Sequence, residues 1–573
     1  MYCSCLKATP MHWYATPDPP AEQVNHLTTA LGVAPVVASL LAQRGITDFD
    51  AAKDFFRPNL EQLHDPFLML GMTDAVDRIL QAIANEEKIL VYGDYDVDGT
   101  TAVALLSSYL RSLHPLVESY IPDRYAEGYG LSEQGVNYAH EQGYSLLITL
   151  DCGIKAVERI QQANALGIDC IICDHHLPGE TLPPALAILD PKQAECPYPY
   201  KELCGCGVGF KLIQALALEQ KQAFEEIASY LDLVATAIAA DIVPLTGENR
   251  ILAYHGLQQL NASPRPGLGA LLAQTKRKPL EFSDLVFVVA PRINAAGRMA
   301  HGAKAVALLS ATAVTAAQVL AHEIEQLNSE RRSMDAQITQ EALEQLKHLN
   351  TPYSTVVMQE DWHKGVVGIV ASRLIEYHYR PTVVLAASEG KYVGSVRSVK
   401  GFNVYEALAA CQAHLLQFGG HKYAAGLTMA PEALPAFRQA FDKAVQERIT
   451  PAQLEPSQTY DVEVSLHELT PKLERILAQM APFGPQNMRP VFRTGGLKDA
   501  GGSRAVGQEQ NHLKLAVTDN KGTVFSGIGF NMAKYLPKIK AGDHFELLYS
   551  LEQNEFNGIK KLQLKVKDLR LIA

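Results

Sequence analysis

The sequence predicts an α/β protein: a parallel-sheet catalytic domain joined by a long helix to a second α/β domain, with a C-terminal β-barrel. Three observations predict this. From about residue 88, short apolar runs that end in polar residues alternate with helical stretches. Residues 313–348 contain no Gly or Pro and repeat apolar residues at helical spacing. Short alternating runs such as "HLKLAVTD" and "KLQLKVKDLRL" fill the last region, as in a small barrel or sandwich.

A chain of 573 residues is too long for a single core, so several domains are expected. Changes in pattern along the chain divide it into an N-terminal region of short helices, the catalytic domain with a helical extension, the connecting helix, the second α/β domain and the barrel. The expected ranges are 1–75, 76–312, 313–350, 351–450 and 451–573.

Composition indicates an ordinary globular protein, with 47% hydrophobic and 20% charged residues. We find no apolar run near the roughly 18 residues of a membrane helix and no signal-peptide pattern, so we expect a cytoplasmic protein with no membrane partner. The nine cysteines are irregularly spaced and do not suggest a disulfide framework. Cys3 with Cys5 and Cys204 with Cys206 lack a second pair at zinc-finger spacing, and "CGCG" at 204–207 receives no function.

Charge is distributed unevenly along the chain. The net charge is −11, yet residues 471–573 hold 16 Lys and Arg against 9 Asp and Glu, a local net of +7 that leaves −18 for the remainder. This asymmetry predicts a basic module attached to an acidic body. The alternative is a basic face that is simply solvated.

Three aspartates follow the first apolar run of the catalytic domain. In "KILVYGDYDVDG", Asp94, Asp96 and Asp98 come directly after a predicted buried strand, and the next helix is expected to open on Gly99. Ligands of open α/β sheets lie at the carboxyl ends of strands. Clustered carboxylates repel one another unless a cation neutralises them, so this motif predicts a metal site.

Other strand or loop ends of the same domain also carry acids or histidines. They are Asp151 in "TLDCG", Asp174, His175 and His176 in "DHH", and Asp241 in "AADIVP". Any one of them could be a helix cap or turn residue. Since successive parallel strands bring their carboxyl ends to one edge, we expect these groups to converge. Carboxylates with few imidazoles favour Mn²⁺ or Mg²⁺, and the acids suffice for two ions that share a bridging carboxylate.

In this order, "DYDVDG", "LDCG", "DHH" and "ADIVP" resemble the DHH phosphoesterase superfamily. Four later motifs are similar to its RecJ family of bacterial exonucleases: "PRINAAGR" (291–298), "WHKGVVGIVASR" (362–373), "GSVRS" (394–398) and "GGHKYAAG" (419–426). The resemblance implies a single-stranded-DNA-specific 5′→3′ exonuclease of recombination and repair that releases 5′-mononucleotides with two Mn²⁺ or Mg²⁺ ions. It also implies an OB fold for the tail, and helicase and single-strand-binding protein partners.

The resemblance assigns roles to the acids and histidines. Asp94 and Asp96 would bind one ion, Asp98, His175 and Asp241 the other, and Asp151 would bridge them. His176 would face the phosphate, and Asp174 would orient a histidine as its hydrogen-bond partner. The residues expected to be catalytic are Asp96, Asp151, His175 and His176.

Positive and small residues in the later motifs are candidate substrate contacts. Arg292 and Arg298 flank "INAAG", whose small residues allow close backbone approach. Ser395 and Arg397 stand two apart, hence on one side of an extended strand. His421 belongs to a glycine turn, and Arg124 to a loop after a strand. Each could instead be an ordinary turn or surface residue. By resemblance, the second α/β domain would close a cleft over the metals.

The basic tail also contains aromatic residues that could stack on bases, although we expect most of them in its core. They are Phe483, Phe492, Phe525, Phe530, Tyr535 and Phe545. Two other functions remain open at this point. One is a DHH-type phosphodiesterase for cyclic dinucleotides, very short oligonucleotides or pyrophosphate, which leaves the tail unexplained. The other is a replication or scaffold factor without metals, which the intact acid and histidine set disfavours.

Overall fold

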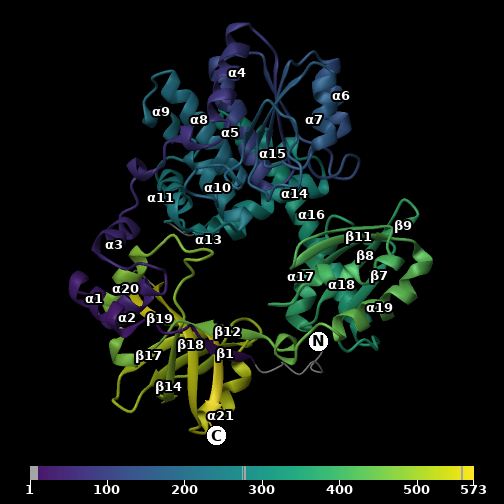
Figure 1. Cartoon of the computed structure of the whole chain (residues 1–573). Helices are drawn as coiled ribbons and strands as arrows, with labels where there is room; N and C mark the ends of the chain where they lie inside the picture. The colour runs from purple at the N-terminus through teal and green to yellow at the C-terminus, as the bar shows by residue number, and fades with distance from the viewer. Residues whose placement is uncertain (1–10, 274, 276–278, 557–558, 573) are drawn as a thin grey trace. The chain divides into compact units, whose positions relative to one another are not determined.

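The computed structural model describes residues 11–273, 275, 279–556 and 559–572, so Cys3 and Cys5 lie outside the described residues. The chain divides into two compact units, and the elements of both are labelled in Figure 1. One unit contains residues 17–328 and 462–573, and the other contains residues 329–461 with the segment that ends at Thr16.

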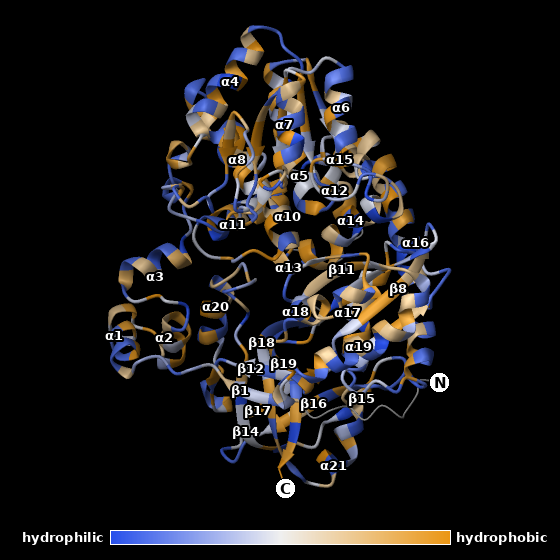
Figure 2. Cartoon of the chain, turned by 45° about the vertical axis from the view of Figure 1, so that its right-hand side comes forward, coloured by the Kyte–Doolittle hydropathy of each residue, from blue (hydrophilic) through white to orange (hydrophobic). Residues whose placement is uncertain are grey.

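A five-stranded parallel sheet forms the centre of the catalytic domain, which confirms the predicted α/β class. Its strand order is β3-β2-β4-β5-β6. The strands are β2 (Ile89–Gly93), β3 (Val117–Tyr120), β4 (Leu146–Leu150), β5 (Asp169–Cys173) and β6 (Ala187–Leu189). β2 and β4 are buried along their whole length, as expected for a sheet covered on both faces, and Figure 2 shows the strands beside α7 and α8 as mainly hydrophobic.

Helices cover both faces of this sheet. The residues of α4 (Met72–Ala84), α5 (Val97–Leu113) and α8 (Gly205–Glu219) pack on one face, and those of α6 (Glu133–Glu141) and α7 (Val157–Ala165) on the other. A helical extension completes the first core. It consists of α9 (Phe224–Ala228), α10 (Leu231–Asp241), α11 (Gly247–Ala262), α12 (Pro266–Leu272), α13 (Phe282–Asp284), a π-helical turn (Leu285–Val289), α14 (Ala290–Met299) and α15 (Ala303–Leu309).

The long connecting helix is present as predicted. α16 (Val314–Leu346) runs for 33 residues, and the division between the two units falls within it. Since the stretch has no Gly or Pro, nothing in its sequence interrupts the backbone hydrogen bonds.

The second unit contains a mixed five-stranded sheet in the order β10-β11-β9-β8-β7, in which only β7 and β8 run parallel. Its strands are β7 (Thr355–Gln359), β8 (Thr382–Ser388), β9 (Lys391–Arg397), β10 (Gln417–Gly420) and β11 (Ala424–Met429). Its helices are α17 (Val367–Tyr377), α18 (Val404–Ala409) and α19 (Leu434–Gln446). The fully buried Phe437 and Phe441 of α19 stack in its core.

The C-terminal region is a closed barrel. β14 (Phe492–Asp499) pairs with both β18 (His544–Phe556) and β16 (His512–Thr518), and β17 (Val524–Gly529) and β19 (Ile559–Ile572) complete the ring. β13 (Val462–Glu463) and β15 (Arg504–Val506) extend it. Two short helices, α20 (Pro471–Gln479) and α21 (Leu536–Lys540), accompany the strands. Five closed strands are the architecture of an OB fold, and Phe492 and Phe545 fill its core, as expected for most of the tail aromatics.

The N-terminal region differs from the expected set of short helices alone. Its first described element is a strand, β1 (His12–Ala15), which pairs in parallel with β12 (Ser457–Tyr460). The aromatic "HWY" residues favour this extended conformation. The helices α1 (Ala21–Leu31), α2 (Pro35–Ala42) and α3 (Phe49–Phe56) share one hydrophobic core with the barrel instead of forming a core of their own.

No helix of the described residues is by itself both long and apolar enough to span a membrane. Within the described ranges, α1 and α2 taken together are the one helix pair that reaches the required length and composition, and the two helices are bent by 117° relative to each other.

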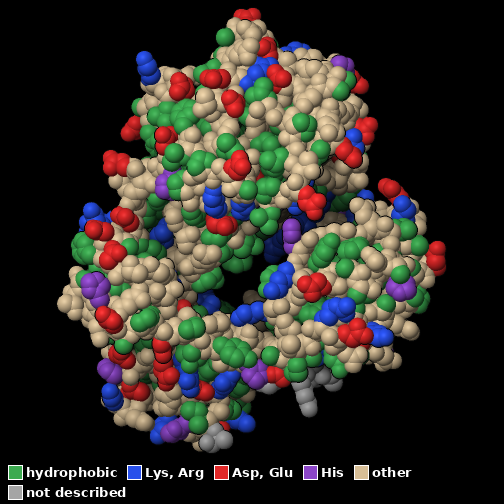
Figure 3. Space-filling model, viewed as in Figure 1, with side chains coloured by type: hydrophobic (Ala, Val, Ile, Leu, Met, Phe, Trp, Pro, Cys, Tyr) green, Lys and Arg blue, Asp and Glu red, His purple; other side chains and the backbone are tan. Residues whose placement is uncertain are grey.

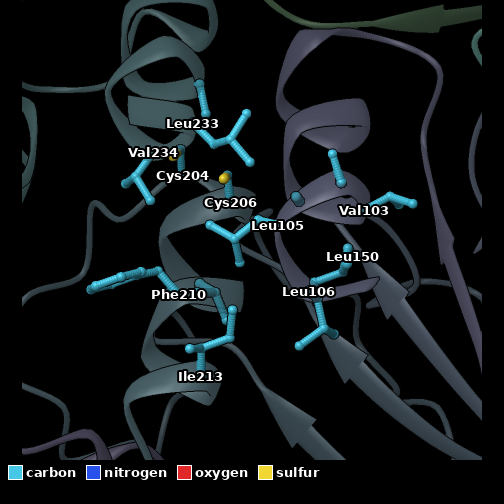
Figure 4. Packing of buried hydrophobic residues seen from close by; sticks show 14 of the residues in the cluster. Val103, Leu105, Leu106, Leu150, Cys204, Cys206, Phe210, Ile213, Leu233 and Val234 are labelled. Carbon is cyan, nitrogen blue, oxygen red and sulfur yellow. The ribbon is translucent and has the colours of Figure 1, made fainter. Parts of the chain in front are cut away.

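Removing a side chain from the catalytic core should lower stability markedly. Leu106 of α5 is fully buried among the residues shown in Figure 4. We expect Leu106→Ala to lower the free energy of unfolding by about 2–5 kcal/mol, because it leaves a cavity between α5 and the sheet. Leu116→Ala is the control, since that side chain is 41% exposed. Equal midpoints of chemical unfolding for the two variants would contradict this packing.

Candidate metal centre and phosphate site

The loop after β2 carries the first three acids. α5 begins at Val97, two residues before the predicted start, because Asp96 serves as its N-cap and accepts a hydrogen bond from the Gly99 nitrogen at 3.1 Å. Asp98 therefore lies within the first helical turn. Gly99 is needed for space, since a Cβ there would lie 2.4 Å from the Asp94 carbonyl oxygen.

The next two strand ends present the remaining ligands of the sheet edge. Asp151 follows β4 in a left-handed conformation (φ 59°), and its nitrogen donates to the Cys173 carbonyl at the end of β5. Asp tolerates this conformation better than most residues, and such strain is typical of functional positions. His175 and His176 follow the end of β5 after one intervening residue, Asp174. The adjacent positions of β2, β4 and β5 bring these groups together, as the parallel sheet predicts.

Asp98, His175 and Asp241 form one set of possible ligands, whose ligand atoms lie within 4.8 Å of one another. Nε2 of His175 is 3.8 Å from Asp98 Oδ2, 3.6 Å from Asp241 Oδ2 and 3.1 Å from Asp151 Oδ1. Asp241 is the last residue of α10. This set has the same three members as the second metal site predicted from the sequence.

Asp151, His175 and His176 form a second set within the same limit. Asp94 and Asp96 are in neither of these sets, although the prediction placed them on the first ion. Asp174 does not join either set, because its Oδ1 is 2.7 Å from Nδ1 of His176 and its Oδ2 accepts from the Ile154 nitrogen. Its position therefore allows it to orient His176.

Burial without a neutralising cation perturbs the titration of the whole cluster. Burial and the Asp96 charge raise the pKa of Asp98 to about 7, and burial together with Asp98 and Asp96 raises that of Asp241 to about 8. Burial, reinforced by neighbouring carboxylates, raises the pKa of Asp94 and Asp151 well above the ordinary value. Burial lowers the pKa of His175 to about 3, so its ring is neutral.

The donor set fits divalent cations. Both carboxylate oxygens of Asp94 and both ring nitrogens of His175 are buried, and within the described part of the chain they make no well-aligned hydrogen bond, although Nε2 of His175 lies 3.1 Å from Asp151 Oδ1. Such unsatisfied groups are costly unless a ligand completes them. Several carboxylates with a neutral imidazole and no thiolate suit Mn²⁺ or Mg²⁺.

The "DRYAEGYG" loop after β3 (residues 123–130) adds an arginine and a tyrosine to this centre. The guanidinium of Arg124 lies over the Tyr95 ring, 4.6 Å from its centroid, and thus next to the aspartate loop. Tyr129 is 57% exposed, and its hydroxyl is 3.3 Å from Nε2 of His176 and 3.4 Å from the Asp151 carbonyl oxygen. The sequence prediction missed Tyr129, although its position between two glycines in this loop was a usable signal.

The two arginines of "PRINAAGR" differ in their surroundings. Arg292 on α14 forms a salt bridge with Glu325 of α16 and donates to the Val288 carbonyl. These contacts hold the guanidinium against α16, and the contact of Arg292 with substrate stays a prediction. Gly297 next to Arg298 gives the expected close backbone approach, but to Tyr95: a Cβ there would lie 2.7 Å from the Tyr95 carbonyl oxygen.

The second unit brings Ser395 and Arg397 together at the start of a helix. Both lie on β9, and Nη1 of Arg397 donates to Ser395 Oγ at 2.8 Å. A Cβ on Gly368, in the first turn of α17, would lie 2.9 Å from Ser395 Oγ and 3.1 Å from Nη2 of Arg397. A helix N-terminus beside Arg and Ser is a typical phosphate site. His421, another of the predicted substrate contacts, lies in the β10–β11 turn, and its side chain is exposed.

The raised pKa values predict how pH affects the metal-free protein. Between about pH 4 and pH 8 the folded chain holds protons on Asp98 and Asp241 that the unfolded chain releases, so stability falls as pH rises through this interval. We expect the melting temperature in EDTA to fall from pH 5 to pH 8, and Mn²⁺ to raise it more at pH 8. Asp241→Asn should flatten the decline. A melting temperature that rises over this interval would contradict the site electrostatics.

Three family models match the chain: the N-terminal domain of the DHH family at residues 88–238, the DHHA1 domain at 350–447 and the RecJ OB domain at 460–568. Relatives named single-stranded-DNA-specific exonuclease RecJ match it over most of its length. The one from Bacillus subtilis is 39% identical over 98% of this chain and 71% of that protein. The one from Escherichia coli is 35% identical over 93% of this chain and 96% of that protein.

Solved structures agree with these relatives. Crystal structures of RecJ from Thermus thermophilus in complex with Mn²⁺ and with Mg²⁺ each cover 98% of this chain, and the chain covers 79% and 78% of them. Their TM-scores are 0.83 and 0.78, at 29% and 28% identity. The chain therefore belongs to the RecJ family of single-stranded-DNA-specific exonucleases, metal-dependent hydrolases of the DHH phosphoesterase superfamily.

Proposed function

We propose that this chain degrades single-stranded DNA from its 5′ end and releases 5′-mononucleotides by two-metal hydrolysis in recombination and repair. The observation that carries the proposal is the buried cluster of carboxylates and histidines at the strand ends, whose Asp94 oxygens and His175 nitrogens make no well-aligned hydrogen bond to the described residues. The relatives' structures with Mn²⁺ and Mg²⁺ support the choice of ions.

The proposed ligands keep their predicted division. Asp98, His175 and Asp241 hold one ion, Asp94 and Asp96 the other, and Asp151 lies between them. Two bound divalent cations supply a hydroxide nucleophile and stabilise the charge of the scissile phosphate and the leaving oxygen. His176 keeps its ring orientation through Asp174, whose carboxylate raises the pKa of His176 against the opposing effect of burial. It thus presents a positive charge or a proton to a phosphate oxygen.

The site of Ser395, Arg397 and the α17 N-terminus supports recognition of a 5′ end. A terminal phosphate carries about −1.5 to −2 charges near pH 7, against one for an internal phosphodiester. The planar guanidinium of Arg397 can bond two phosphate oxygens, and the missing side chain of Gly368 leaves room for Ser395 and Arg397 beside the first turn of α17. In the unit that contains the metal centre, Arg124, next to the aspartate loop, and Arg298 are separately proposed as phosphate contacts. His421 remains a candidate in the same unit as Arg397.

The barrel supports binding of a longer strand. Figure 3 shows basic and acidic side chains intermixed over the face in view, so specific pairs are more informative than overall charge. Arg504 on β15 lies opposite Lys514 on β16, and burial together with Arg504 lowers the pKa of Lys514. Like charges placed opposite each other cost stability, and a phosphate would relieve this. Phe530 is 53% exposed, and its ring meets the edge of His512, which suits stacking on a base.

The alternative function is a phosphodiesterase for cyclic dinucleotides or very short oligonucleotides. It would use the same metal centre but would not require a barrel of the RecJ OB type. We therefore favour long single strands as substrate. From that substrate we further infer a cytoplasmic location, and a helicase and a single-strand-binding protein as partners, because single strands arise by unwinding and are covered as they form.

Substitution of Arg397 should separate recognition of the 5′ end from chemistry. We expect Arg397→Ala to slow degradation of 5′-phosphorylated single strands at least tenfold more than that of 5′-hydroxyl strands, because only a terminal phosphate is bound by the guanidinium. Lys391→Ala, at the other end of β9, is the matched control. Asp151→Ala should abolish cleavage of both substrates. A 5′ label retained on a ladder of shortening fragments would show digestion from the 3′ end and refute the assigned polarity.

Substitutions on the barrel should reduce affinity and its salt dependence. We expect the double variant Arg504→Ala/Lys514→Ala to bind long single strands more weakly and to lower the slope of log K against log salt by about 0.7 for each phosphate that these side chains neutralise. Lys472→Ala on α20 is the control. Point variants are preferable to removal of the barrel, because the Leu245 nitrogen near Asp241 donates to the Pro485 carbonyl. An unchanged slope would show that these positive charges contact solvent and not the phosphates of the DNA.

A further inference from the structure

The "CGCG" turn (residues 204–207) begins α8 and points toward the carboxylate cluster. Cys204 is the N-cap, and its Sγ accepts a hydrogen bond from the Gly207 nitrogen at 3.4 Å. The helix that follows has 15 residues, so its first turn presents backbone N–H groups without partners inside the helix.

Two of these N–H groups hold Asp98. The Gly205 nitrogen donates to Asp98 Oδ2 and the Cys206 nitrogen to Asp98 Oδ1, each at 2.7 Å. Both carboxylate oxygens are therefore fixed by backbone atoms of a helix more than 100 residues away in the chain, and the positive end of that helix favours the ionised carboxylate. Charge-assisted bonds of this kind are short and strong.

The same turn also touches Asp151. A Cβ on Gly205 would lie 2.6 Å from the Cβ of Asp151 and 2.8 Å from its Cα, a clash with backbone that no flexible side chain could relieve. Gly205 has no positive φ, so the requirement is for space and not for an unusual backbone conformation. Gly207 differs, because a Cβ there would meet its nearest neighbours at an ordinary 3.5 Å.

The thiols of the turn belong to the hydrophobic core. Figure 4 shows Cys206 near Leu105 and Leu233, and Cys204 near Val234. Both cysteines are fully buried and unoxidised, and burial raises their pKa well above the ordinary value. The thiols therefore pack as small apolar groups, and the turn acts through its backbone.

We propose that Gly205 and Cys206 are positioning residues of the metal centre. Their N–H groups fix the Asp98 carboxylate. Because Gly205 has no side chain, Asp151 can lie directly against the Gly205 backbone. The turn thereby sets the separation of two proposed metal ligands. This inference rests on the proposed metal-binding role of Asp98 and Asp151.

A pair of glycine variants tests the proposal through metal binding rather than activity. Mn²⁺ can be titrated into the full chain while the electron paramagnetic resonance signal reports free Mn²⁺. We expect the affinity for Mn²⁺ to be about 10- to 100-fold weaker in Gly205→Ala and unchanged in Gly207→Ala. Cys204→Ser should also match the wild type, because a serine oxygen caps the helix at least as well. Wild-type affinity in a folded Gly205→Ala overturns the inference. Failure of the wild-type chain itself to bind Mn²⁺ overturns the proposed function instead.

A second measurement does not require Gly205→Ala to fold. Amide hydrogen exchange at Gly205 and Cys206 should be slow in the wild-type chain and at least tenfold faster in Asp98→Ala, where both acceptors are gone. Exchange at Val208, whose nitrogen bonds to the Cys204 carbonyl, is the internal control for the integrity of α8. Equal exchange at Gly205 and Cys206 in the two proteins would show that Asp98 is not held by this turn.

Discussion

Mutual repulsion of buried carboxylates is the constraint on which the catalytic domain depends. Asp94, Asp98 and Asp151 are almost completely buried, and His175 Nε2 lies within 4 Å of carboxylate oxygens of both Asp98 and Asp241. In the absence of a cation this arrangement raises the pKa of the acids, and each such shift is a loss of stability at neutral pH. A pair of divalent cations would convert the same repulsion into ligand binding, since each carboxylate would then gain a partner.

The surrounding fold keeps these acids together by close approach of backbone to backbone. Three glycines allow this close approach: Gly99 lies against Asp94, Gly205 against Asp151 and Gly297 against Tyr95. A Cβ added at any of these three glycines would lie less than 3 Å from an atom of the residue that it approaches. The chain therefore uses main-chain contacts, which are rigid, to position side chains that would otherwise move apart. Relaxation of one contact would change the spacing of the ligands without removing any of them.

The sequence predicted the location of the centre better than its internal organisation. Strand-end acids could be recognised because parallel strands share an edge, and Asp98, His175 and Asp241 do come together. The sequence could not show that the 204–207 turn holds Asp98, since that bond joins residues distant in the chain through backbone atoms that carry no sequence signal. The same holds for the pairing of Arg292 with Glu325 and for the core that α1–α3 share with the barrel, because tertiary packing alone determines them.

The central claim is that two divalent cations occupy this cluster. Anomalous diffraction from crystals of the chain grown with Mn²⁺ tests it most directly, because manganese positions appear without reference to any assumed ligand. The account predicts two peaks, one among Asp98, His175 and Asp241 and one beside Asp94 and Asp96, with Asp151 between them. A single peak, or peaks away from the carboxyl ends of β2, β4 and β5, would contradict it.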